Sequence, residues 1–225
     1  MTGDTVRPGG FVLTDRAIAF CSLPERSRVL DVGCGIGATV TRLRKRYLLD
    51  AYGLDSSSKL LREARGLDSE TPLVMGTASS LPVSDKELSA VFCECVLSLT
   101  SDQWIVLGEF YRVLRFGGLL ILTDLYARSP SHSSELHGLP VLSCLSGAMS
   151  KSDIEVRITK SGFRILLWED HSALLKELAV RLIFAGSSLQ DLWGGGCSKP
   201  DASCFPPPIR KARPGYYLLI ARKEA

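Results

Sequence analysis

The chain has 225 residues, of which 45% are apolar and 23% are charged, so it can bury a core large enough for one globular domain. This composition excludes a disordered tail and a collagen-like fibre. A formal net charge of +3 is too small to predict a surface for nucleic acid. The longest uncharged stretches fall well short of the roughly 20 residues that cross a bilayer, so we expect no membrane span and a soluble protein.

The distribution of charge and cysteine indicates the compartment. The first twenty residues carry four charged side chains and no continuous apolar block, which argues against a secretory signal and predicts a cytoplasmic protein. The seven cysteines are an odd number and show no paired CxxC spacing. We therefore expect free thiols, no disulfide framework and no metal site of the structural zinc type.

The first half of the chain alternates between short apolar strands and amphipathic helices. The predicted elements, in order, are a helix from Thr14 to Cys21, a strand over 28–32, a helix over 37–47, a strand over 51–54 ending at Asp55, a helix after the capping serines 56–58, a strand over 72–75, a buried strand over 88–97, a helix over 101–114 and a strand over 119–123. This alternation predicts an α/β fold, with a parallel sheet that has helices on both faces.

Beyond residue 126 the pattern is looser. We expect a helix near 152–161, a strand over 163–168, an apolar helix near 173–185, an irregular segment over 186–214 and a last strand over 216–221 at the edge of the sheet. An irregular segment as long as 186–214 in a compact domain is more often functional or mobile than without a role. We expect a single domain over 1–225, and the apolar helix leaves both a monomer and a homodimer open.

The strongest chemical pattern is a glycine loop between the first strand and its helix. Gly33, Gly35 and Gly37 alternate there, so the backbone can approach a ligand without interference from a Cβ atom. Asp55 ends the next strand 24 residues after Asp31, where a carboxylate can accept hydrogen bonds from both hydroxyls of a ribose. The loop therefore predicts a nucleotide-like cofactor.

Three stretches resemble motifs of class I S-adenosylmethionine-dependent methyltransferases, in the family's order. Residues 29–37, VLDVGCGIG, resemble motif I, with Asp31 in the acidic position. Residues 52–55, YGLD, resemble the second motif, and residues 112–120, RVLRFGGLL, resemble the helix-turn-strand motif, with Phe116 where proline is usual. Within this class, the chain resembles the methyltransferase type 11 family, which is similar to the ubiquinone and menaquinone methyltransferases.

The resemblance implies a Rossmann-like fold with a mostly parallel seven-stranded sheet, and S-adenosyl-L-methionine as cofactor, with S-adenosyl-L-homocysteine as its product. It assigns residues 28–125 to the cofactor-binding core and 126–225 to a substrate-side half. It also implies that the N-terminal segment 1–27 contains a helix and that residues 7–11 can cover the pocket as a lid.

The cofactor contacts follow from matching the motifs position by position. The family usually has Gly-Asp-Ala after the third strand, whereas this chain has Thr77 in the acidic position, so Ser79, Ser80 or Asp85 could also contact the adenine. The end of the fourth strand should lie beside the methionine moiety. The expected cofactor-binding residues are Asp31, Gly33, Cys34, Gly35, Gly37, Asp55, Ser56, Thr77, Ala78, Glu94 and Cys95.

A narrower resemblance, to arsenite methyltransferases, lies in residues 123–128, 144–148 and 160–163. In that family a cysteine before a Gly-Ala pair helps to bind trivalent arsenic, and Cys144 holds the matching position. Soft thiolates suit a soft acceptor. Cys197 and Cys204 lie in a late loop, as that family's final cysteine does, although the local sequence differs. A free cysteine is more commonly a small buried apolar group.

No catalytic residue stands out from the sequence. The weak candidates are Cys95, Cys144 and His171, the last of which Glu169 or Asp170 could orient as a base. His171 reaches the pocket edge only if the sixth strand is parallel to the others. His132 and His137 are expected to be surface residues.

Four functions stay open on the sequence alone. The favoured one is methyl transfer from S-adenosylmethionine to a small-molecule acceptor, and the second is thiol-dependent methylation of arsenite or a selenium species. An NAD-dependent oxidoreductase is the third, because Ala38 can replace the last glycine of a dinucleotide fingerprint; the missing Tyr-x-x-x-Lys pair disfavours it. The fourth is a cofactor-binding module without turnover. The acceptor is not specified by any motif.

Overall fold

The computed structural model describes residues 7–136, 143–184 and 207–224, and these form a seven-stranded sheet in the order β3-β2-β1-β4-β5-β7-β6. The strands are β1 (Arg28–Val32), β2 (Asp50–Asp55), β3 (Leu73–Met75), β4 (Leu88–Glu94), β5 (Leu114–Ala127), β6 (Phe163–Asp170) and β7 (Pro214–Lys223). Strands β1 to β5 pair in parallel, and β7 is antiparallel to both of its neighbours. The expected mostly parallel, seven-stranded sheet is confirmed.

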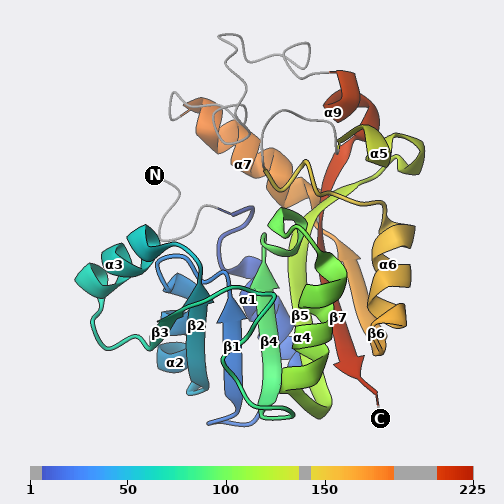
Figure 1. Cartoon of the computed structure of the whole chain (residues 1–225). Helices are drawn as coiled ribbons and strands as arrows, with labels where there is room; N and C mark the ends of the chain where they lie inside the picture. Colours follow the sequence, from blue (N-terminus) through green and yellow to red (C-terminus); the bar gives the residue numbers. More distant parts are fainter. Residues whose placement is uncertain (1–6, 137–142, 185–206, 225) are drawn as a thin grey trace.

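Helices cover both faces of the sheet, which gives three layers (Figure 1). One face carries α1 (Val12–Cys21), α2 (Ala38–Tyr47), α3 (Ser58–Leu67) and α7 (Ser172–Phe184), and the other carries α4 (Gln103–Val113) and α6 (Lys151–Lys160). Alternate strand residues belong to separate apolar cores: Phe92 of β4 packs in the first, and Val91 in the second. None of the described helices is long and apolar enough to span a bilayer.

The last strand lies inside the sheet, so its predicted place at the edge was wrong. In Figure 1, β7 lies between β5 and β6 and points opposite to the strands around it. Residues 216–221 are at most 1% exposed, as expected for a strand covered on both faces. Hydrophobicity reports that a strand is buried but not which neighbours pair with it. Since β7 is antiparallel to both, β6 runs parallel to β5 and ends at the same edge.

Several predicted boundaries also changed. Thr14 does not cap α1: the helix begins at Val12, and the Thr14 side chain is buried. Ser57 does cap α3, as its hydroxyl accepts from the backbone N–H of Leu60 at 3.3 Å. β4 ends at Glu94 because the chain turns at Cys95, which has a φ of 59°, and then forms the 3-10 helix η1 (Leu97–Leu99).

The connections after β5 contain short helices. These are η2 (Pro130–His132), α5 (Ser133–Leu136) and α9 (Pro207–Ala212). The last of them occupies part of the segment that the sequence predicted as irregular. His137, Cys197 and Cys204 lie outside the described residues.

Candidate functional site

A cavity of about 660 Å³ opens at the carboxyl ends of β1, β2 and β4. This volume lies within the range of about 300 to 1,000 Å³ usual for small-molecule sites. The walls come from the glycine loop, the end of β2, the turn after β3, the end of β4 and the first turn of α4. Eight of the expected cofactor-binding residues line it: Gly33, Gly35, Asp55, Ser56, Thr77, Ala78, Glu94 and Cys95.

The remaining three expected residues are not among those that line the cavity. Asp31 is buried in β1, with 3% of its surface exposed. Cys34 packs its sulfur against Gly53, where a Cβ atom would lie 2.7 Å from the sulfur. Gly37 is the N-cap residue of α2.

The glycine loop has backbone geometry and open space that suit a ligand. Gly33 has a φ of 76°, and a Cβ there would lie 2.2 Å from a methyl group of Val96, so the position requires glycine. A Cβ on Gly35 would meet nothing within 4 Å. The Gly35 N–H donates to Asp55 Oδ2 at 2.8 Å, and the Ser57 N–H donates to Oδ1 at 2.8 Å. Asp55 is thus fixed at the cavity wall with lone pairs left for a ribose diol.

Glu94 is the centre of a buried polar cluster that no sequence motif indicated. Its Oε2 lies 2.5 Å from Arg7 Nη1 and accepts from the Thr39 hydroxyl at 3.0 Å. Its Oε1 accepts from the Thr14 hydroxyl at 2.9 Å, and Arg7 also donates to both hydroxyls. The Arg7 and Glu94 side chains are only 13% and 2% exposed. The cluster therefore joins the N-terminal segment, α1 and α2 to the end of β4.

The same end of the cavity has two buried carboxyl groups, Asp31 and Glu94, close to the guanidinium of Arg7. Burial raises the pKa of the Asp31 carboxyl, the negative charge of Glu94 raises it further, and the positive charge of Arg7 lowers it. A nearby cation favours the ionised form of a carboxyl group. A cationic ligand group bound here would therefore draw Asp31 toward its ionised form.

Cys95 and Cys144 lie against each other beside the cavity. The Cys144 sulfur is 3.5 Å from the Cys95 carbonyl oxygen, and the Cys95 sulfur is 3.1 Å from the hydroxyl of Tyr216. Burial raises the pKa of Cys144 to about 12 and that of Cys95 well above its ordinary value. Both are therefore neutral thiols at pH 7 in this arrangement.

The loop that carries Cys144 has a clear packing constraint. A Cβ atom on Gly147 would lie 1.8 Å from the carbonyl oxygen of Ser98, so the backbone of this loop packs directly on η1. Ser98 in turn donates its N–H and hydroxyl to the buried Asp124, at 2.9 and 2.8 Å. Close packing thus accounts for the glycine of the Cys-Leu-Ser-Gly-Ala stretch.

His171 stands at the edge of the sheet that also carries the cavity, but it does not line the cavity. Its Nε2 lies 2.9 Å from Glu169 Oε2, and Glu169 pairs with Arg16 of α1 at 2.6 Å. Asp170 instead accepts from the Tyr126 hydroxyl. Glu169 is thus the partner of His171, and the group belongs to a polar contact between β6 and α1. Within the described ranges, no three His, Cys, Asp or Glu side chains form a cluster that could hold a metal.

One wall of the cavity was absent from the sequence analysis. It is formed after β4 and at the start of α4, by Leu99, Thr100, Ser101, Asp102, Ile105 and Val106. Leu99 and Ile105 are 38% and 53% exposed, so this wall presents apolar side chains to solvent beside polar ones. Local sequence marks Asp102 as the cap of a helix, which it is, but gives no sign that this helix end borders a cavity.

Known proteins with similar sequences include methyltransferases, and the matched residues contain the glycine loop and Asp55. Residues 30–122 match the family described as "Methyltransferase domain". An arsenite methyltransferase of Halobacterium salinarum is 26% identical over 153 residues, which cover 64% of this chain and 39% of that protein. This chain thus spans about two fifths of that relative's length.

Two solved structures share the fold. The cyclase SpnF superposes with a TM-score of 0.73 at 25% identity, over 95% of this chain and 81% of its own. The phosphoethanolamine N-methyltransferase 2 of Haemonchus contortus, solved with S-adenosyl-L-methionine, superposes with a TM-score of 0.74 at 19% identity. The match covers 99% of this chain and 55% of that protein. Over residues 30–122 the chain is thus similar to the methyltransferase domain family, and its seven-stranded fold is shared with a methyltransferase solved with S-adenosyl-L-methionine.

Proposed function

We propose that this chain transfers the methyl group of S-adenosylmethionine to a small-molecule acceptor. The observation that carries the proposal is the fixed Asp55 carboxylate beside the open glycine loop, at the wall of a cavity of about 660 Å³. When bound, the cofactor supplies a methyl group on a positively charged sulfur. The chain then has to orient donor and acceptor and exclude water, which can lower a barrier by roughly 7 to 11 kcal/mol.

Each wall of the cavity has a proposed role. Asp55 accepts from the ribose hydroxyls, and Thr77 and Ala78 border the adenine. Glu94 at the wall and Asp31 behind it supply carboxyl groups for the ammonium group of the methionine moiety, whose positive charge favours the ionised form of Asp31. These roles match the chemistry of the groups present at each wall.

The acceptor is proposed to enter beside the exposed apolar side chains of Leu99 and Ile105. The N-terminal segment is attached to the end of β4 through Arg7, whose guanidinium contacts Glu94. Because this segment contacts both the core and α7, where a Cβ on Gly9 would lie 2.7 Å from Leu174, we propose one domain for the whole chain.

The first test is binding. The thermal midpoint of unfolding should rise with S-adenosylhomocysteine and stay unchanged with NAD, because a ligand at 100 times its dissociation constant adds about 2.7 kcal/mol to stability. A rise with NAD alone would identify a dinucleotide site instead.

The Asp55→Ala variant tests the ribose contact. Loss of a charged acceptor should weaken binding of S-adenosylhomocysteine by about 1.5 to 3 kcal/mol, measured by isothermal titration. Asp50→Ala, at the other end of β2, is the matched control and should bind as the wild type does. Equal affinities of the wild type and Asp55→Ala would contradict the proposed placement.

A second candidate is methyl transfer to a soft, thiol-bound acceptor such as arsenite or a selenium species. It is favoured by the contact of Cys144 with Cys95, which lines the cavity, and by the relative named as an arsenite methyltransferase. Under this candidate, Cys144→Ser abolishes turnover of trivalent arsenic while affinity for S-adenosylhomocysteine is retained. Turnover of arsenite by the variant would exclude it.

A further inference from the structure

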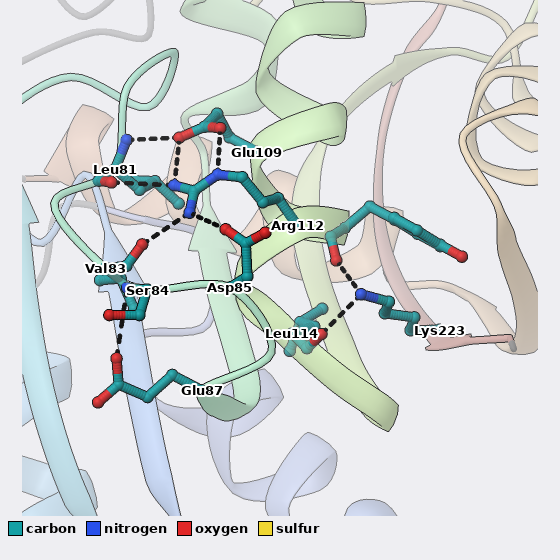
Figure 2. Close-up of polar contacts among 10 residues, drawn as sticks. Leu81, Val83, Ser84, Asp85, Glu87, Glu109, Arg112, Leu114 and Lys223 are labelled. Atoms are coloured by element: carbon teal, nitrogen blue, oxygen red, sulfur yellow. Dashed lines mark hydrogen bonds and ion pairs between the residues drawn. The ribbon is translucent and has the colours of Figure 1, made fainter.

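Arg112, in the last turn of α4, uses every donor of its guanidinium group. Figure 2 shows the arrangement. Its Nε and Nη2 donate to the two oxygens of Glu109 at 2.7 and 2.8 Å. Its Nη1 donates to the Val83 carbonyl at 2.7 Å and to Asp85 Oδ1 at 2.8 Å, and Nη2 also donates to the Leu81 carbonyl at 3.0 Å. An arginine side chain has five N–H donors, so this group is saturated.

Glu109 and the backbone of Arg112 complete the attachment. Glu109 Oε2 accepts from the N–H of Leu81 at 2.7 Å, so Leu81 is held through both its N–H and its carbonyl. The N–H of Lys86 donates to the carbonyl of Arg112 at 2.9 Å. We call residues 81–86 the strap, because these contacts bind them to one turn of α4.

The strap continues directly from a wall of the cavity. Thr77, Ala78 and Ser79 line the cavity, and Leu81 follows two residues later. At the other end of this turn, the N–H of Gly76 donates to the Asp55 carbonyl at 3.0 Å. The cavity-lining turn is therefore held at one end by β2 and at the other by Glu109 and Arg112.

Helix α4 also contributes to the cavity itself. Ile105 and Val106 line it from the first turn of the helix, while Glu109 and Arg112 lie in its later turns. The far end of the helix is fixed by Lys223 of β7, whose Nζ donates to the carbonyls of Tyr111 and Leu114 at 2.5 and 2.8 Å. The helix is thus a fixed body that carries one cavity wall and holds the end of another.

We propose that Arg112 is a positioning residue for the adenosine half of the cofactor, acting through the strap on Thr77–Ser79. The inference rests on the proposed function. Arg112 is not among the residues that line the cavity, so its effect must pass through the residues that it holds. Lysine cannot replace it, since an ammonium group has three donors and no planar fork.

The test compares ligand affinity with stability. Binding of S-adenosylhomocysteine and of 5′-methylthioadenosine, which lacks the amino-acid end, is measured by isothermal titration well below the thermal midpoint of every variant. Arg112→Lys should weaken both ligands by the same factor of about ten, which corresponds to about 1.4 kcal/mol. The matched control is Arg115→Lys, an exposed arginine three residues away, which should bind both ligands as the wild type does.

Asp85→Ala provides a milder variant, because it removes only one exposed partner of Arg112. It should weaken both ligands severalfold and serves if Arg112→Lys does not fold. Wild-type affinity in a folded Arg112→Lys or Asp85→Ala protein, with only the thermal midpoint lowered, would overturn the inference. Failure of the wild type to bind either ligand would instead overturn the proposed function, and the inference with it.

Discussion

Two buried carboxylates at the ends of neighbouring strands are stabilised in different ways. Glu94 of β4 is 7% exposed, contacts the guanidinium of Arg7 and lines the cavity. Asp124 of β5 is 2% exposed and receives three neutral donors, the N–H and hydroxyl of Ser98 and the N–H of Leu125, at 2.8 to 2.9 Å. Glu94 therefore has the positive charge of a guanidinium beside it, whereas Asp124 accepts only from neutral N–H and O–H groups.

The pKa of Asp124 shows that hydrogen bonds from neutral donors do not offset the effect of burial. Burial raises it to about 6, although the hydrogen bonds from Ser98 and Leu125 act in the opposite direction. Ionised Asp124 therefore costs free energy in the folded state. Glu94 is thus paired with a cation at the wall of a ligand cavity, whereas Asp124 binds Ser98 and so holds η1 in place.

The largest effect is expected from breaking the Glu94 pair. Glu94→Gln keeps the shape but leaves the mostly buried Arg7 without its counter-charge, and loss of one partner of a buried pair costs about 3 to 5 kcal/mol of stability. The free energy of unfolding, measured with urea, should fall by an amount near the lower end of that range, because Arg7 comes from an N-terminal segment.

A double variant provides the control for this effect. If the unpaired charge is the cause, Glu94→Gln combined with Arg7→Met should be more stable than Glu94→Gln alone. If the loss of stability in the double variant equals the sum of the losses in Glu94→Gln and Arg7→Met, the two residues are not coupled.

The next effect concerns Asp124 and pH. Its pKa in the folded state, about 6, lies above the ordinary value of 3.8, so its contribution to stability is full below about pH 4 and is lost as the pH rises through 6. Relative to Asp124→Asn, which does not titrate, the wild type should lose on the order of 3 kcal/mol between pH 4 and pH 7. Unfolding free energies of both proteins at several pH values give this difference, and a constant difference would refute the shifted pKa.

The smallest effect is expected from Ser98→Ala. This change removes one hydroxyl donor to Asp124 and should cost about 1 kcal/mol at pH 7. The cost should shrink below pH 6, where the carboxyl group is protonated. Ser101→Ala, which alters an exposed hydroxyl in the next turn of chain, is the control and should leave stability unchanged at both pH values.

Much of the fold could be predicted because the relevant signals are local. The strand that ends at Asp55 and the Ser57 cap depend on residues within a few positions of each other. The glycine loop likewise signals a turn locally, since glycine readily adopts the positive φ that Gly33 has. Eight of the eleven cofactor-binding residues expected from the motifs line the cavity.

The errors came from contacts between distant residues. β7 was assigned to an edge because its sequence shows burial but not its partners, β5 and β6. Thr14 was assigned to a helix cap because threonine is common there, whereas its hydroxyl donates to Glu94, 80 residues away. The role of His171 as a base stays a prediction, and what the sequence did not indicate is that its partner Glu169 is paired with Arg16, 153 residues distant.

The sequence by itself therefore determined the alternating α/β pattern, the glycine loop and the acid that ends the second strand. Only the tertiary structure decided the place of β7, the burial of Arg7 against Glu94 and the attachment of the strap to Arg112. The physical reason is the range of the interactions: backbone conformation and capping are set by neighbours in sequence, whereas strand pairing and the pairing of buried charges depend on which distant segments the folded core brings together.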